Sequence, residues 1–114
     1  MFPYLNDIEE IEQKTRTGKR TVYFCFNYNS FQEIESAMLR SLEKKDFFVN
    51  HLDIVCPVNL LIRTGGANVL SGFLLPQLAN ARLYFSEKLF NDYTTEDFEK
   101  CINEYMRSEL KYGV

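Results

Sequence analysis

An arginine, two hydroxyl side chains and two glycines lie within one short stretch, at Arg63, Thr64, Gly65, Gly66 and Ser71. A guanidinium can bind a phosphate through two parallel N–H groups, and glycines let backbone amides approach an anion closely. A helix that begins at Ser71 would add its positive N-terminal end. These residues predict a phosphate site. The alternative is an ordinary strand–loop–helix turn, with Arg63 in a structural salt bridge and Ser71 as a helix cap.

Other residue types that carry chemistry do not form a recognisable constellation. His51 is the only histidine and has no ligand-spaced partner, so it is interpreted as a surface or packing residue. An acidic cluster is interpreted as favouring the start of the last helix; it consists of Asp92, Glu96 and Asp97. No catalytic or metal-ligating residue is therefore predicted. The odd number of cysteines, without metal-like spacing, indicates reduced thiols in a cytosolic protein; they are Cys25, Cys56 and Cys101.

Three apolar runs are expected to form the sheet that positions the phosphate site. The segments 21–26 and 58–63 lack polar alternation, which is typical of strands buried on both faces, and 82–85 reads as a third strand. Arg63 would then lie at the carboxyl end of its strand, where open α/β sheets place their ligands. The sequence predicts one α/β domain over residues 1–114, with a partial parallel sheet of about three strands and helices on both faces.

Helical patterns separate these runs. The sequence predicts helices over 6–14, from Ser30, over 71–80 and from Thr94 or Thr95 to about Leu110, with one or two turns between 47 and 52. Ser30 and Glu33 have the spacing of a capping box at the start of the second helix. The predicted buried face of that helix contains Phe31, Ile34, Met38 and Leu42.

Composition limits the classes of partner. The 114 residues are 46% hydrophobic and carry a formal net charge of −3, which provides no basic field for nucleic acid. No apolar run approaches the roughly 18 residues of a membrane span. A three-stranded sheet with few covering helices would leave an apolar edge open, and such edges recruit another chain or aggregate. The sequence therefore predicts a protein partner, no nucleic acid and no transmembrane segment.

The stretch around the predicted site resembles the signature block of cis-prenyltransferases, the undecaprenyl and dehydrodolichyl diphosphate synthases. The resemblance rests on Leu60-Leu-Ile-Arg-Thr-Gly-Gly66, Leu70-Ser71, Phe73-Leu-Leu75, Gln77, Ala79, Ala81 and Leu83-Tyr-Phe85, and extends to Asn27-Tyr28, Leu89–Tyr93, Phe98, Tyr105 and Lys111-Tyr-Gly113. It implies the C-terminal half of that fold. It also implies that Arg63 and Ser71 contact the diphosphate of isopentenyl diphosphate, with Thr64, Gly65 and Gly66 in the same loop.

The chain departs from the family pattern where the family does its chemistry. Nothing resembles the Asp-Gly-Asn-x-Arg motif, whose Asp anchors magnesium and the allylic diphosphate. Arg82 stands where the family has a magnesium-binding Glu, a reversal that repels a cation unless the guanidinium itself neutralises diphosphate. Further differences are Asn59, Ala67, Val69, Pro76 and Asn29-Ser30-Phe31. The family uses Mg²⁺, but this chain alone is expected neither to bind it nor to catalyse condensation.

Three functions follow from this pattern. The first is an accessory subunit or half-enzyme of polyprenyl diphosphate synthesis, such as dolichol biosynthesis, with Lys111 and Gly113 in a tail that enters a partner's active site. The second is the C-terminal part of an active synthase, and the third is a non-enzymatic interaction module that retains only the fold. The expected partner is a second copy or a catalytic cis-prenyltransferase subunit. The expected location is cytoplasmic, or peripheral to a membrane through a complex.

Overall fold

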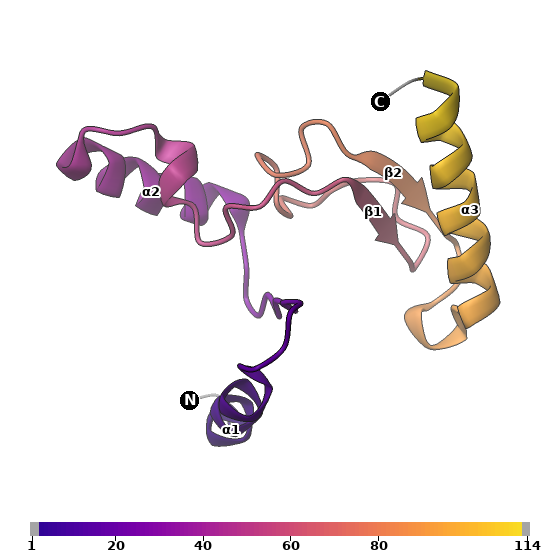
Figure 1. The fold of residues 1–114 in the computed structure, drawn as a ribbon, viewed down its shortest axis with the longest axis horizontal. Coiled ribbons are helices and arrows are strands. Elements are labelled where there is room, and N and C mark those ends of the chain that lie inside the picture. The colour runs from indigo at the N-terminus through magenta and orange to yellow at the C-terminus, as the bar shows by residue number, and fades with distance from the viewer. Residues whose placement is uncertain (1–2, 113–114) are drawn as a thin grey trace.

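The computed structural model describes residues 3–112, with side chains to residue 108. Three α-helices, two strands and two short 3-10 helices follow one another along the chain (Figure 1). In chain order they are α1 (Leu5–Thr15), α2 (Ser30–Lys44), η1 (Phe48–His51), β1 (Leu60–Arg63), β2 (Arg82–Phe85), η2 (Phe90–Asp92) and α3 (Thr95–Tyr112). The predicted helices at 6–14 and 94–110 and the short turn at 47–52 are confirmed.

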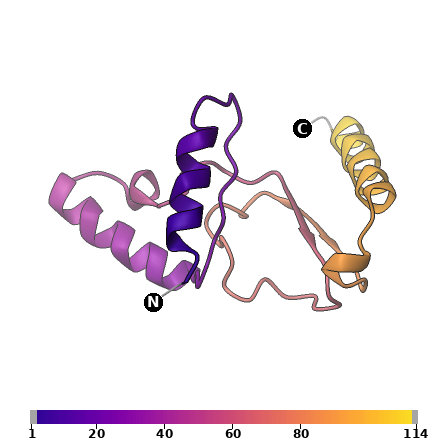
Figure 2. The ribbon, with the colours of Figure 1, turned by 90° about the horizontal axis from the view of Figure 1, so that it is seen from below.

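β1 and β2 pair in parallel, in a register that places Leu60 opposite Arg82 and Arg63 opposite Phe85. The α/β class and the partial parallel sheet are therefore confirmed. α3 flanks this sheet on the side away from α2, and α1 stands apart from it (Figures 1 and 2). The carboxyl ends of both strands lie at one edge, and Arg63 is the last residue of β1.

The strand predicted at Thr21–Phe26 does not form. These residues run as an irregular segment in which Val22 is 74% exposed and Phe24 is 72% exposed. Backbone hydrogen bonds to a neighbouring strand define a strand, and in the described part of the chain β1 pairs only with β2. In the described part of the chain, the segment therefore stays largely exposed.

The helix predicted over 71–80 is also wrong. This stretch consists of turns, and Ser71, Gly72 and Leu74 have positive φ angles of 52°, 71° and 44°. A right-handed helix cannot contain such residues. Pro76 opposes a helix as well, because it lacks an N–H group and disfavours helical geometry at the preceding residue. No helix N-terminus therefore faces Arg63 from this stretch.

α2 begins at Ser30, but its cap differs from the predicted capping box. The N-cap is Asn29, whose side chain accepts a hydrogen bond of 2.8 Å from the amide of Phe31. Ser30 and Glu33 are buried and bond to other segments. The predicted buried face is also wrong: Phe31, Met38 and Leu42 are exposed, and Ile34 is half-buried, because the helix packs on η1 through a different side.

The well-buried part of the molecule is small. Its buried apolar residues are Ala37, Leu52, Leu74, Leu78 and Cys101. The radius of gyration is 16.8 Å, whereas a compact domain of this length has about 13 Å. The accessible surface is 9661 Å², against about 6,500 Å² for a compact protein of this mass. The chain thus exposes far more surface than a self-contained domain.

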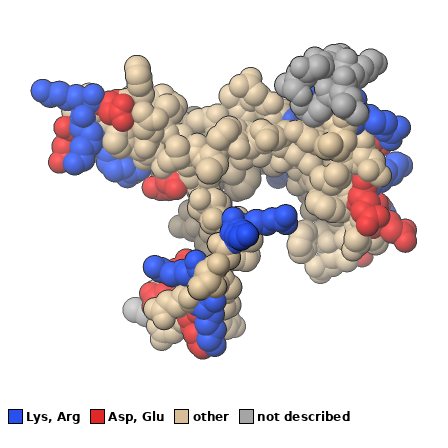
Figure 3. All heavy atoms as spheres, viewed as in Figure 1, with Lys and Arg blue, Asp and Glu red and all other residues tan. Residues whose placement is uncertain are grey.

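Charged side chains lie mainly over α1, the far end of α2 and α3, and the middle of the molecule is largely uncharged in the view of Figure 3. The three cysteines are free; Cys101 is buried, Cys25 is half-buried and Cys56 is exposed, so burial of all three does not hold. Among residues 3–112, none of the helices combines the length and the apolar character that crossing a membrane requires.

Candidate functional site

Arg63 and Ser71 meet across the loop that follows β1. The Nη1 atom of Arg63 donates a hydrogen bond of 3.0 Å to the Ser71 hydroxyl and a second bond to the carbonyl oxygen of Val69. Arg63 is half-buried. Among the side chains of residues 3–108 it forms no ion pair with a carboxylate, so the salt-bridge alternative has no support there. Two residues predicted to share a phosphate site are therefore adjacent.

Gly65 and Gly66 shape the loop in a different way from that predicted. Their φ angles are 96° and 86°, which only glycine adopts readily. The Gly65 amide donates to the carbonyl of Lys88 at 2.8 Å, and the Gly66 amide donates to that of Ser86 at 3.0 Å. These amides join the loop to the segment after β2 and are already occupied. Thr64, between Arg63 and the glycines, is half-buried.

Arg82 lies at the other end of the sheet. It pairs with Leu60 in the strand register, and its amide donates to the Asn59 carbonyl at 2.9 Å. Its backbone is three strand positions from that of Arg63 along the register, about 10 Å at the usual rise per residue. Arg63 therefore lies at the carboxyl end of β1, whereas Arg82 lies at the amino end of β2.

Of the acidic cluster, Asp97 has the predicted role at the start of α3. Asp97 accepts hydrogen bonds from the Thr94 amide at 2.9 Å and from the Lys88 ammonium at 2.9 Å, and the Thr94 hydroxyl accepts from the Asp97 amide. The bond from the Thr94 amide, followed by that from Lys88, lowers the pKa of Asp97 to about 2. The His51 side chain is largely buried, and its Nε2 atom lies 3.5 Å from Oδ2 of Asp46. Neither feature provides a catalytic pair.

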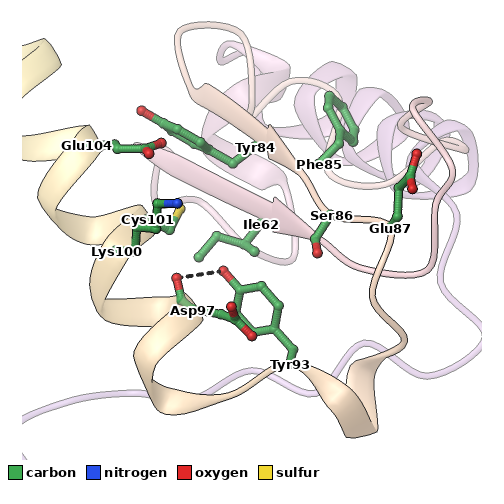
Figure 4. Close-up of a pocket in the computed structure, with 10 residues that line it drawn as sticks. All are labelled: Ile62, Tyr84, Phe85, Ser86, Glu87, Tyr93, Asp97, Lys100, Cys101 and Glu104. Atoms are coloured by element: carbon green, nitrogen blue, oxygen red, sulfur yellow. Dashed lines mark hydrogen bonds between the residues drawn. The ribbon is translucent and has the colours of Figure 1, made fainter.

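A cavity of about 350 Å³ between the sheet and α3 was not predicted (Figure 4). Ile62 and Tyr84 reach it from the strands, and Tyr93, Asp97 and Cys101 reach it from the η2–α3 segment. Its other lining residues are Phe85, Ser86, Glu87, Lys100 and Glu104. These residues are far apart in the chain, so no local motif could have indicated them.

The chemistry of this cavity is mild. Burial, and then the Glu104 charge, raise the pKa of the Cys101 thiol, so it stays protonated and is not an activated nucleophile. Burial also raises the pKa of Tyr93, whose hydroxyl donates to the Asp97 carbonyl oxygen at 3.4 Å (Figure 4). Nothing in this lining pairs a nucleophile with a base.

The C-terminal residues predicted to form a tail are only partly visible. Lys111 belongs to the last turn of α3 by its backbone, and its side chain is outside the described part. Gly113 lies outside the described residues. Among the side chains described, those of residues 3–108, no three His, Cys, Asp or Glu groups gather closely enough to hold a metal ion.

Comparison with known proteins identifies the family of this chain. Residues 3–113 match a family model described as "Putative undecaprenyl diphosphate synthase". An isoprenyl transferase of Campylobacter jejuni is 35% identical over 109 residues, covering 90% of this chain and 49% of the relative. An isoprenyl transferase of Treponema denticola is 36% identical over 118 residues, covering 95% and 52%.

A solved structure gives the same result for the fold. The crystal structure of "a probable undecaprenyl diphosphate synthase" from Campylobacter jejuni superimposes with a TM-score of 0.80 at 34% identity, covering 89% of this chain and 51% of that one. The chain belongs to the cis-prenyltransferase family of undecaprenyl diphosphate synthases. It spans about half the length of the curated relatives it matches.

Proposed function

We propose that this chain takes part in polyprenyl diphosphate synthesis by supplying part of the isopentenyl diphosphate site, and that it is inactive alone. The contact between Arg63 and Ser71 carries the proposal. Both hydrogen bonds of Arg63 use Nη1. Among the described residues no acceptor takes up Nε or Nη2, and that edge of a guanidinium suits two oxygens of one phosphate group. Thr64, Gly65 and Gly66 hold the loop that separates Arg63 from Ser71.

Magnesium does not fit the site as this chain builds it. The groups that meet at Arg63 are a guanidinium, a hydroxyl and a backbone carbonyl, and no carboxylate among the described side chains of residues 3–108 joins them. Magnesium needs several oxygen ligands, usually including a carboxylate. The proposal therefore assigns diphosphate binding to the arginine and derives no step through a metal.

A second polypeptide would complete the enzyme. The accessible surface exceeds that of a compact protein of this mass by about 3,000 Å². A standard interface buries about 800 Å² per partner, so this excess is of the size found in obligate complexes. The partner would be a catalytic cis-prenyltransferase chain or a second copy. Lys111 and Gly113 would then belong to a segment that reaches the partner's active site.

Titration of isopentenyl diphosphate into the purified chain tests the site. The expected Kd is about 0.1–1 mM, the affinity of one or two strong contacts after association costs. Arg63→Ala should abolish binding, and Arg63→Lys should weaken it because the bidentate fork is lost. Arg20→Ala, which removes the same charge from an exposed position, is the control. Equal affinity in the wild type and Arg63→Ala would exclude this function.

A condensation assay tests the expected inactivity. Farnesyl diphosphate and radiolabelled isopentenyl diphosphate are incubated with the pure chain and magnesium, and no polyprenyl product is expected above the blank. Product formation by the pure chain would show that it is an enzyme by itself. The same assay with a co-purified partner chain tests whether activity returns on assembly.

A further inference from the structure

Four polar side chains form a network beside the candidate site, which we call the Glu33 network: Tyr28, Ser30, Glu33 and Gln77. Tyr28 precedes α2, Ser30 and Glu33 lie in its first turn, and Gln77 belongs to the turns that follow Ser71. Ser30, Glu33 and Gln77 are all at least nine-tenths buried. The mechanism proposed above uses none of these groups.

Glu33 is the centre of this network and joins three segments of the chain. Its Oε1 accepts hydrogen bonds from the Tyr28 hydroxyl and, at 3.1 Å, from Nε2 of Gln77. Its Oε2 accepts from the Ile54 amide at 3.1 Å. Nε2 of Gln77 also donates to the Ile54 carbonyl at 2.8 Å. One carboxylate thus holds α2, the segment before β1 and the turns after Ser71.

Ser30 extends these links to the loop that carries Ser71. Its amide donates to the Gly72 carbonyl at 2.8 Å, and its hydroxyl accepts from the Leu75 amide at 2.8 Å. The Tyr28 hydroxyl lies 3.1 Å from the same Ser30 oxygen. The backbone on the C-terminal side of Ser71 is therefore fixed to the first turn of α2, and Ser71 in turn holds Nη1 of Arg63.

Burial of a carboxylate costs free energy unless hydrogen bonds or an ion pair replace the water that it loses. Glu33 is 4% exposed, and none of the ion pairs in the described part of the chain includes it. Burial alone would raise the pKa of Glu33, but the bonds from Tyr28, Ile54 and Gln77 outweigh it and hold the pKa below the usual value. The Glu33 carboxylate is instead compensated by hydrogen bonds from Tyr28, Ile54 and Gln77.

We infer that Glu33 is a positioning residue: through Gln77, Tyr28 and Ser30 it holds the Gly72–Leu75 backbone, and thereby Ser71, in the place where Ser71 orients the Arg63 guanidinium. This inference rests on the proposed function, because it assigns the network to the diphosphate contact. It predicts a functional effect from a residue that does not touch the ligand.

The test uses Glu33→Gln in the full chain, with inorganic pyrophosphate as the probe. Glu33→Gln keeps the shape but removes an acceptor, and affinity should fall about fivefold, as expected for one lost hydrogen bond. Glu35→Gln, on an exposed part of the same helix, is the matched control and should bind like the wild type. In a Ser71→Ala background, Glu33→Gln should cause no further loss, because its effect passes through Ser71. The inference would be overturned if Glu33→Gln lowered affinity as much in the Ser71→Ala background as in the wild type. Unchanged affinity in Glu33→Gln alone would also overturn it.

Tyr28→Phe provides a second variant that removes the same bond from the other side while keeping the ring, which packs edge-on against Phe73. It should weaken binding by about the same fivefold in the wild type, since one hydrogen bond is lost, and not at all in Ser71→Ala. It keeps the test decisive if Glu33→Gln does not fold.

Amide hydrogen exchange separates this inference from the proposed function. In Glu33→Gln and Tyr28→Phe, exchange should accelerate at the Ser30 and Leu75 amides relative to Glu35→Gln. If the wild type does not bind pyrophosphate, the proposed function fails, and accelerated exchange still supports the positioning of the loop by Glu33. Unchanged exchange at both amides contradicts the positioning role whatever the ligand does.

Discussion

β1 and the segment from Val22 to Phe26 are both short apolar runs in the same chain, but their surroundings differ. All four residues of β1 are half-buried, and the strand has β2 beside it in parallel register. Val22, Phe24 and Phe26 are more than half exposed, and the Phe24 and Phe26 rings stack on each other with centroids 6.1 Å apart. The first run has a neighbouring strand, whereas the second forms no strand and stays largely exposed.

The difference shows that this molecule contains a packed part, around β1, and an exposed part, residues 5–26. Around β1, backbone bonds from Gly65, Gly66 and Ser86 close the loop, and the Glu33 network holds its far side. Before Asn27 the chain has α1, with no buried residue, and the exposed apolar segment. An apolar segment without cover is a docking surface or an aggregation hazard. The predictions below compare these two parts.

The largest effect is expected from Ile62→Asp. Ile62 is half-buried in β1 and faces the cavity under α3, so an aspartate would place an unpaired charge between the sheet and the helix. The free energy of unfolding should fall by about 3 kcal/mol. Urea unfolding followed by circular dichroism measures it. A loss below 0.5 kcal/mol would mean that the sheet and α3 do not pack as described.

The matched substitution in the exposed part is Phe24→Asp. Because Phe24 is 72% exposed, unfolding free energy should change by less than about 0.5 kcal/mol. Association with a second copy or a catalytic chain should instead weaken by about tenfold or more, since a buried aromatic anchor is lost. Gln13→Asp in α1 is the charge control. Light scattering that shows a monodisperse 13.4 kDa wild-type monomer at high micromolar concentration would contradict the need for a partner.

The Glu33 network should make the stability of the packed part depend on pH. The pKa of Glu33 is lower in the folded state, so its contribution is present above about pH 4.5 and is lost as pH falls through the folded value. Burial and the bond to Glu33 raise the pKa of Tyr28 to about 12, so its contribution is present below about pH 10 and is lost towards pH 12.

Urea unfolding of the wild type and Glu33→Gln across pH measures this dependence. Glu33→Gln should lower the unfolding free energy by about 1–2 kcal/mol at neutral pH, and the difference should shrink below pH 4.5. Tyr28→Phe should remove part of the alkaline loss. Parallel wild-type and Glu33→Gln profiles at acid pH would show that the carboxylate does not titrate with folding.

The smallest effect concerns the start of α3. Thr94 and Asp97 exchange hydrogen bonds there, whereas α1 has no side-chain cap bond. Thr94→Ala should lower the unfolding free energy by about 1 kcal/mol, the usual value of an N-cap hydroxyl. Thr95→Ala, one residue later in the helix, is the control. Thermal unfolding distinguishes them, and equal values for both variants would exclude a specific cap.

Residue pattern alone was enough for several parts of this protein. Helical periodicity predicted α1 and α3, and the apolar runs at 58–63 and 82–85 predicted the two strands that form. The signature from Leu60 to Phe85 led to the family, and the proximity of Arg63 and Ser71 agrees with it. These are local properties, because helix caps, strand patterns and motif spacing depend on residues that are near in sequence.

What the sequence by itself determined is therefore the identity of the elements near the site and the family, whereas the tertiary structure decided which elements find a partner. The 21–26 run does not become a strand because strand hydrogen bonds need a neighbouring chain segment. The 71–80 stretch does not become a helix because its backbone is fixed from outside by Ser30, with Ser71, Gly72 and Leu74 at positive φ. The Gly65 and Gly66 amides, expected to face an anion, bond to Lys88 and Ser86 instead. Apart from Pro76, which was a local signal against the helix, each outcome depends on contacts between residues distant in the chain, which local patterns do not contain.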